Sequence, residues 1–198
     1  NREKIVAWLH EKVAQAQGCK VQDQSASLAQ IAIQGPASRD ILTAAGLADL
    51  TTLKIRHCLD ATLCGHSLLV TRTGYTGELG YELYLPAAGA PTVWDRLLEA
   101  GRPLGIKPAG LGARDLLRLE MAYLLYGNDM NEETTPIEAG AEWVVKFDKG
   151  DFIGRTELLA QQSQGAARRL VAFELVEKAV PRHGFKILSA QVPHAEIG

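Results

Sequence analysis

The stretch His66–Leu85, HSLLVTRTGYTGELGYELYL, decides the fold. Residues 66–73 and 81–85 are rich in aliphatic, aromatic and β-branched side chains, and Pro86 ends the second run, so each run is predicted to be a strand. The two runs are separated by glycines at a spacing of three residues, Gly74, Gly77 and Gly80. A dinucleotide-binding loop needs a helix after its glycines, whereas a strand follows here. The segment is therefore interpreted as a glycine-rich hairpin turn between antiparallel strands.

Segments on both sides of this stretch extend the pattern to an α+β fold. Upstream, strands are predicted over 27–34 and 53–58, with a helix between them that begins near Pro36. Downstream, Pro91 begins another helix, which Gly101 ends. This order approaches a ferredoxin-like split βαβ unit with an antiparallel sheet. Two further helices are predicted, over residues 3–17 and 109–126.

The pattern changes near Trp143. The segments 143–147 (WVVKF) and 169–175 (RLVAFEL) are predicted to be strands, with a short helix at 155–163 between them. We therefore expect two domains. The first covers residues 1–145, and residues 146–198 are the start of a β-rich C-terminal domain.

Composition and charge exclude several classes of protein. The 198 residues are 46% hydrophobic and 22% charged, which are ordinary values for a globular domain. A formal net charge of −2 does not suit a nucleic-acid-binding protein. No apolar run approaches the ~20 residues that span a bilayer, so no membrane partner is expected. Three cysteines are a sparse and odd-numbered set, and the first residues lack the apolar segment of a signal peptide, so we expect a reducing, cytoplasmic location.

Glu82 is the first candidate site residue. In the strand that contains it, Glu82 and Tyr84 share one face, opposite the apolar residues. The carboxylate therefore faces either solvent or a polar cavity. In a cavity it would suit a ligand with adjacent N–H donors, such as a guanidine-like or pterin edge, which it could hold with two charge-assisted hydrogen bonds.

Arg114 is the second candidate. It lies one helical turn before Arg118 among leucines, and the two side chains project together. One interpretation is that the arginines pair with Asp115 and Glu120 on the helix surface. The other is that Arg114 and the helix N-terminus face an anionic or carbonyl group of a ligand.

The sequence gives little support for a metal site or for a hydrolase. Cys58 and Cys64 are flanked by His57 and His66, but the two cysteines are farther apart than the cysteine pairs of zinc sites, so no metal is expected. Neither G-x-S-x-G nor H-E-x-x-H occurs, which leaves no signature of a serine hydrolase or a zinc protease. The polar loop 125–136 is long for a compact chain, and such loops are more often functional than not.

Three long motifs resemble one family. GYTGELGYEL (74–83), PAGLGARDLLRLE (108–120) and LYGNDMNEETTP (125–136), in this order and at these separations, closely resemble the aminomethyltransferases (T-proteins) of the glycine cleavage system. The segments GPASRDIL and DFIGRTEL match further positions of the family. The resemblance covers nearly the whole chain.

This resemblance implies a transferase of glycine catabolism and one-carbon metabolism. Members take an aminomethyl group from the lipoyl arm of the H-protein, pass the one-carbon unit to tetrahydrofolate and release ammonia. Their fold has three subdomains around a folate channel, which makes residues 1–145 a partial folate-binding core. By motif position, Glu82 resembles the carboxylate that holds the amino edge of the pterin. Tyr75, Arg114 and Trp143 resemble further residues of the folate pocket.

One departure from the family limits the expected activity. The family's catalytic aspartate lies upstream of these motifs, outside the 198 residues, so no catalytic residue is assigned. We expect the isolated chain to be inactive and to self-associate through surfaces that the rest of the family fold would cover. The alternatives are a folate-binding protein without aminomethyl transfer, of the iron–sulfur assembly type, the folate domain of a demethylating dehydrogenase, and a non-catalytic remnant.

Overall fold

The computed structural model describes residues 1–15, 18–181 and 184–190. The chain divides into two compact units, Asn1–Leu124 and Leu125–Gly198, and each is described by itself. Within the described ranges, no helix combines the length and the apolar character that crossing a membrane requires.

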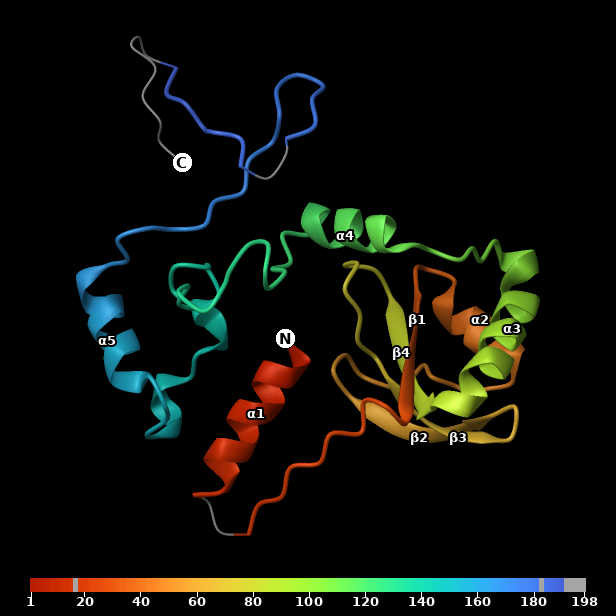
Figure 1. Cartoon of the computed structure of the whole chain (residues 1–198). Helices are drawn as coiled ribbons and strands as arrows, with labels where there is room; N and C mark the ends of the chain where they lie inside the picture. The colour runs from red at the N-terminus through yellow and green to blue at the C-terminus, as the bar shows by residue number, and fades with distance from the viewer. Residues whose placement is uncertain (16–17, 182–183, 191–198) are drawn as a thin grey trace. The chain divides into compact units, whose positions relative to one another are not determined.

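The first unit contains a four-stranded sheet in the order β1-β4-β3-β2, and every neighbouring pair is antiparallel (Figure 1). The strands are β1 (Leu28–Gln34), β2 (Cys58–Leu63), β3 (His66–Thr71) and β4 (Gly80–Pro86). On β4, Leu83 lies opposite Ile31 of β1 on one side and Val70 of β3 on the other. These three apolar side chains pack side by side on one face and help to set the register of the sheet.

The connections of the sheet follow the split β-α-β arrangement that the sequence predicts. Because β1 and β3 both run antiparallel to β4, they run parallel to each other with β4 between them. The chain joins them through helix α2 (Ser38–Ala45) and the edge strand β2. The predicted α+β class with an antiparallel sheet is thus confirmed. β2 is an additional strand at the edge of this split β-α-β unit.

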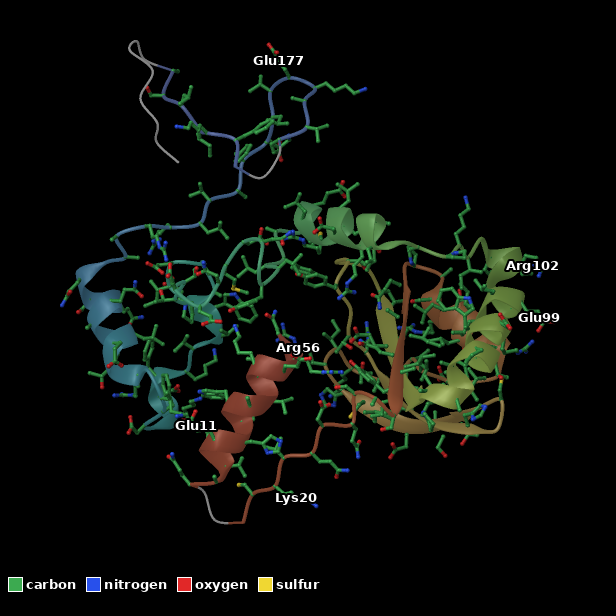
Figure 2. All side chains as sticks on the ribbon, viewed as in Figure 1. Glu11, Lys20, Arg56, Glu99, Arg102 and Glu177 are labelled. Carbon is green, nitrogen blue, oxygen red and sulfur yellow. The ribbon has the colours of Figure 1, made fainter. Side chains whose placement is uncertain are left out.

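Helices α2 and α3 (Ala90–Gly101) pack against each other and cover one face of the sheet (Figure 1). The almost completely buried side chains of this core include Leu42, Val70, Tyr81, Leu83, Leu85 and Val93. Burial of one such aliphatic side chain contributes roughly 1.5–3 kcal/mol. Glu99 and Arg102 lie at the outer side of this helical layer in Figure 2, in contact with solvent. The opposite face of the sheet carries polar residues, Gln30, Glu82 and Tyr84 among them, together with the exposed Leu28 and Leu69.

Glycine and proline residues set most of the helix ends at the predicted positions. α2 ends at Gly46, whose φ of 116° is left-handed. α3 carries Pro91 in its first turn, and the short 3-10 helices η1 (Ala87–Gly89) and η2 (Arg102–Leu104) flank it. α1 (Arg2–Val13) begins as predicted but ends earlier, because it buries none of its residues and no packing extends it.

Two predicted element boundaries are wrong. Helix α4 (Leu111–Glu120) is shorter than the predicted 109–126, because the chain reverses at Ala122, whose φ of 53° is left-handed. The strand predicted over 53–58 is not formed. Arg56, labelled in Figure 2, has a φ of 64° that interrupts an extended chain, and β2 begins only at Cys58.

The hairpin between β2 and β3 is tighter than the sequence suggests. Its turn consists of Cys64 and Gly65, with φ values of 51° and 77°. Two consecutive positive φ values are typical of the two-residue turn that best fits the twist of a hairpin. The connection therefore takes two residues, and the rest of the predicted polar connection belongs to β2.

The second unit is built from short helices. They are η3 (Glu142–Val144), η4 (Phe147–Lys149) and α5 (Arg155–Gln164). α5 confirms the helix predicted over 155–163. The strands predicted over 143–147 and 169–175 are wrong, since η3 and η4 occupy the first segment and the second forms no regular element.

A strand needs a neighbouring strand for its backbone hydrogen bonds. The described residues of this unit form no strand. The β-rich C-terminal domain is thus not confirmed. The domain boundary predicted between 145 and 146 stays a prediction.

Candidate functional site

Polar side chains gather on the face of the sheet that the helices leave open. Gln30 of β1 and Glu82 and Tyr84 of β4 lie on this face, because their neighbours in each strand point into the core. Gln30 pairs directly with Tyr84 across the two strands. Strand alternation in the sequence predicts this placement of Glu82 and Tyr84.

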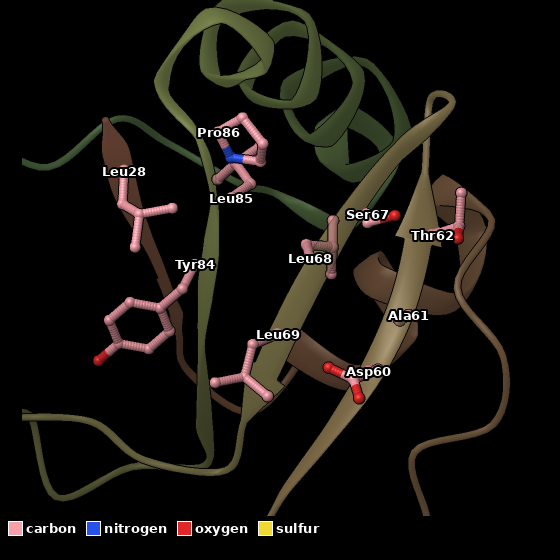
Figure 3. Close-up of a pocket in the computed structure, with 10 residues that line it drawn as sticks. All are labelled: Leu28, Asp60, Ala61, Thr62, Ser67, Leu68, Leu69, Tyr84, Leu85 and Pro86. Carbon is pink, nitrogen blue, oxygen red and sulfur yellow. The ribbon is translucent and has the colours of Figure 1, made fainter. Parts of the chain in front are cut away.

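An open pocket of about 460 Å³ lies beside Tyr84 on the sheet (Figure 3). Its walls come mostly from β2, β3 and β4, and Asp60, Leu69 and Tyr84 are among the side chains that line it. Glu82 is not one of its lining residues. The pocket is therefore a neighbour of the predicted site rather than the site itself.

The carboxylate of Glu82 is held by three side chains. Gln30 donates from Nε2 to Glu82 Oε1 over 2.7 Å, and the hydroxyl of Thr73 donates to Oε2. The hydroxyl of Tyr84 donates more weakly to Oε2, over 3.4 Å. All three donors are neutral, so they orient the carboxylate without adding a positive charge. A carboxylate accepts about four hydrogen bonds, so Glu82 retains one acceptor position, and a ligand N–H group that replaced the weak bond from Tyr84 would take a second.

This arrangement changes the pKa of Tyr84. Its pKa is raised above the ordinary value, first because the phenol is partly buried and then because the negative charge of Glu82 lies beside it and accepts its hydrogen bond. Gln30 also donates from Nε2 to the Tyr84 oxygen over 3.2 Å. Gln30, Glu82 and Tyr84 thus form one connected polar cluster on the open face.

Tyr75 lies in the glycine loop between β3 and β4, against the segment that follows α4. Its hydroxyl donates to the backbone carbonyl of Leu124. Its ring stacks on the ring of Tyr123, with centroids 5.7 Å apart and planes inclined by 25°. The guanidinium carbon of Arg114 lies 4.9 Å from the centre of the Tyr75 ring, which is within range of a cation–π interaction.

The two arginines of α4 have different partners. Arg118 is buried and donates from Nε to Asp115 over 2.7 Å and from a terminal nitrogen to the carbonyl of Tyr123 over 3.1 Å. Arg114 is exposed and lies over Tyr75. The predicted pairing with Asp115 is therefore found for Arg118, although its guanidinium is buried rather than on the helix surface, whereas Arg114 is exposed.

The structure brings together only some of the predicted site residues. Arg114 and Tyr75 are in contact, and Thr73, two residues before Tyr75, links the same loop to Glu82. Trp143 lies in η3 of the second unit, and its side chain is largely exposed there. Its assignment to the folate pocket stays a prediction.

Sequence reasoning did not single out three residues of these clusters. Tyr123 falls inside the predicted helix 109–126, and only its contact with Tyr75 distinguishes it. Gln30 and Thr73 become visible only when β1, β3 and β4 are placed side by side. No motif in the sequence marks either of them.

In the part of the chain that the structure describes, no group of three or more His, Cys, Asp and Glu side chains could hold a metal ion. Cys19, Cys58 and Cys64 are all exposed and free. The expectation that the site works without a metal remains a prediction.

These groups suit a flat ligand with polar edges. The carboxylate can accept two adjacent N–H groups, the tyrosine rings offer faces for stacking, and the arginine can bind an anionic or carbonyl group. Fold and site thus define the chain as an α+β domain with a candidate ligand site on one sheet face and the adjoining loop. The family model of the GCVT N-terminal domain matches residues 1–149, and the chain belongs to this family.

Known proteins agree with this assignment. The chain is 49% identical over 187 residues to the aminomethyltransferase of Halothermothrix orenii, and the match covers 94% of this chain and 52% of that protein. It is 44% identical over 199 residues to the aminomethyltransferase of Caldanaerobacter subterraneus, covering 100% of this chain and 52% of that protein. The chain thus spans about half the length of the curated relatives it matches.

A solved structure supports the fold. The glycine cleavage system aminomethyltransferase T from Bartonella henselae is similar with a TM-score of 0.69 and 32% sequence identity. The similarity covers 82% of this chain and 44% of that protein. The resemblance to aminomethyltransferases that the three sequence motifs indicate is confirmed.

Proposed function

We propose that these residues form the pterin-binding part of an aminomethyltransferase of the glycine cleavage system. The complete enzyme would transfer a one-carbon unit from the aminomethyl-lipoyl arm of H-protein to tetrahydrofolate, with release of ammonia. The observation that carries the proposal is the oriented carboxylate of Glu82 on the open sheet face, beside a loop whose Tyr75 stacks under Arg114. Relatives named aminomethyltransferase favour this function over a folate-binding protein without transfer chemistry.

Each residue has a role that follows from its chemistry. Glu82 would accept hydrogen bonds from the amino edge of the pterin, because a carboxylate matches two adjacent N–H donors. Tyr75 would pack against the flat ring, and Arg114 would bind a carbonyl or carboxylate of the folate. Trp143 is proposed as a further wall of the pocket on motif position alone.

The chemical step needs more than these residues supply. Transfer depends on charge stabilisation and positioning in a closed site, and no acid of this chain is proposed to act as the catalytic one. We propose that the 198 residues alone bind folate without transferring the aminomethyl group. H-protein is the proposed protein partner, and self-association of the isolated chain is a further proposal. A cytoplasmic location is proposed because the three exposed cysteines are free.

Titration of the chain with tetrahydrofolate under reducing conditions, followed by calorimetry, tests this proposal. We expect saturable binding that Glu82→Gln weakens roughly tenfold to hundredfold, because a charge-assisted pair becomes neutral. Glu78→Gln is the matched control, since Glu78 is an exposed acid of the same loop. Equal affinities of wild type and Glu82→Gln would show that Glu82 does not hold the ligand.

A further inference from the structure

The loop between β3 and β4 is attached to the junction between β1 and α2. This loop carries Thr73, which binds the Glu82 carboxylate, and Tyr75, which lies under Arg114. Near its far end, the carbonyl of Leu79 accepts a hydrogen bond from the backbone N–H of Gly35 over 2.8 Å and from the hydroxyl of Ser38 over 3.1 Å. The junction thus holds the end of the loop that leads into β4.

Gln34 holds both ends of the loop at once. Its Nε2 donates to the carbonyl of Thr73 over 3.2 Å and to the carbonyl of Tyr81 over 3.1 Å. Thr73 is the second residue after β3, and Tyr81 is the second residue of β4. A single side-chain amide therefore bridges the two points where the loop leaves and rejoins the sheet.

Two glycines make room for this amide. A Cβ atom on Gly74 would lie 2.0 Å from Gln34 Oε1, and a Cβ atom on Gly80 would lie 1.8 Å from the same oxygen. Neither glycine has a positive φ, whereas Gly77 does. A side chain at Gly74 or Gly80 would therefore displace the Gln34 amide, whereas the backbone conformation does not call for glycine at either position.

The oxygen atom of the same side-chain amide is unsatisfied. Gln34 Oε1 is buried and has no hydrogen-bond partner among the residues that the structure describes, which is unfavourable for a polar atom. A side chain selected for stability alone would avoid this cost, for example by an apolar group of the same size. The two hydrogen bonds from Nε2, which join the loop ends, are the feature that an apolar group could not replace.

We propose that Gln34 is a positioning residue that holds the glycine loop so that Tyr75 and Thr73 meet the ligand in a fixed arrangement. The proposal rests on the proposed function for its ligand, tetrahydrofolate. Gln34 does not itself touch the ligand. It acts through the loop, on the stacking partner of Arg114 and on the hydroxyl that orients Glu82.

A pair of substitutions tests the contact between Gln34 and the glycines. Gly80→Ala places a methyl group against Gln34 Oε1, so we expect a clear fall in melting temperature in the wild-type background. In the Gln34→Ala background the obstructing oxygen is gone, and the same substitution should cost much less. Gly112→Ala is the control, because a Cβ at Gly112 meets no atom within 4 Å. Equal losses of melting temperature from Gly80→Ala in both backgrounds would show that position 80 and the Gln34 side chain are not in contact.

Gln34→Met tests the positioning role, because it keeps the length of the side chain and removes both donors. In chain labelled with 3-fluorotyrosine, the fluorine signal of Tyr75, assigned with Tyr75→Phe, should shift or broaden. Tetrahydrofolate binding should weaken roughly tenfold, which is more than any accompanying fall in melting temperature accounts for. Gln162→Met, at an exposed position of the second unit, serves as the control.

The outcomes separate this proposal from the proposed function. An unchanged fluorine signal and unchanged affinity in Gln34→Met would overturn the positioning role. Loss of affinity only in proportion to a fall in melting temperature would also overturn it, since that is what a structural role alone predicts. If the wild type binds no tetrahydrofolate, the proposed function of this chain fails, and the fluorine signal still decides whether Gln34 holds Tyr75. If Gln34→Met does not fold, Gln34→Asn is used, because its shorter amide cannot reach both carbonyls.

Discussion

The charge of Glu82 acts on the hydroxyl of Tyr84 as well as on a ligand. Burial and the neighbouring carboxylate both favour the neutral phenol, so the pKa of Tyr84 is raised in the folded chain. In the unfolded chain the phenol ionises near its ordinary pKa of about 10. The contribution of this group to folding stability is therefore complete below that pH and is lost as the pH rises through the higher, folded-state pKa.

Glu82→Gln is expected to lower the pKa of Tyr84 part of the way to its ordinary value. The substitution removes the negative charge, while the burial of the phenol, which is the larger cause, remains. The titration of the tyrosine Cζ signals by carbon NMR measures the change, with the Tyr84 signal assigned from Tyr84→Phe. Glu78→Gln should leave the Tyr84 titration as it is in the wild type. The same midpoint in Glu82→Gln would show that the two groups do not interact.

The same residues show what the sequence can predict about a site. Strand alternation was sufficient to place Glu82 on the face opposite the core. It could not identify Gln30, which lies 52 residues earlier in the chain, because the pairing of β1 with β4 is a property of the folded sheet. Nor could helical spacing decide between the partners of Arg114, since the Tyr75 ring comes from a distant loop.

Helix α4 connects stability and ligand binding through two arginines one turn apart. Arg118 is buried, and it donates a hydrogen bond to the backbone carbonyl of Tyr123. The ring of the same Tyr123 stacks on Tyr75. Arg114 is exposed, and its contact is a cation–π interaction with Tyr75. The inner arginine is thus part of the fold, and the outer one is part of the candidate site.

Substitution of each arginine by methionine should separate these roles. Arg118→Met leaves the Tyr123 carbonyl and Asp115 without their donor, and we expect a loss of roughly 1–3 kcal/mol of folding stability. The partner Asp115 is half exposed, which keeps the expected loss below that of a fully buried pair. Arg114→Met should cost about 1 kcal/mol or less, because an exposed cation–π contact is weak, yet it should weaken tetrahydrofolate binding.

Urea unfolding followed by circular dichroism gives the two stabilities, and calorimetry gives the two affinities. Equal losses of stability in Arg118→Met and Arg114→Met would contradict the difference in burial on which this assignment rests.

The elements show where sequence patterns are strong and where they are weak. Helices α2 and α3 were predictable because proline and glycine mark their ends and their apolar faces have a sheet to cover. The strands predicted over 143–147 and 169–175 failed because an apolar, β-branched segment becomes a strand only beside a partner. In this chain those segments have no such neighbour among the described residues.

At the scale of the whole molecule, the second unit depends on a few polar contacts between distant segments. Glu138 accepts a hydrogen bond from the backbone N–H of Thr135 over 2.9 Å and one from Arg168 over 3.2 Å. Its own carbonyl accepts from the N–H of Leu170 over 2.8 Å. Thr135 in turn donates from its hydroxyl to Gln161 of α5 over 2.7 Å. The loop 125–136 thus ends at a junction that ties it to α5 and to the segment after it.

This junction should make the second unit sensitive to acid. The hydrogen bond from the Thr135 N–H, followed by the one from Arg168, holds the pKa of Glu138 below its ordinary value. A lowered pKa contributes stability that is complete above the unfolded-state pKa and is lost as the pH falls through the folded-state pKa. We expect the urea midpoint of this unit to fall as the solution is acidified through that range. In Glu138→Gln the midpoint should be lower near neutral pH and should depend less on acid.

Trp143 lies in this unit, so its fluorescence reports unfolding there once Trp8 and Trp94 are replaced by phenylalanine. Glu157→Gln, in the first turn of α5, is the matched control, because it removes one exposed carboxylate of the same unit and none of the junction contacts. If Glu138→Gln and Glu157→Gln retain the same dependence on acid as the wild type, the junction does not hold the unit together. A dependence lost only in Glu138→Gln would show that one carboxylate joins the polar loop 125–136 to the segment that follows α5.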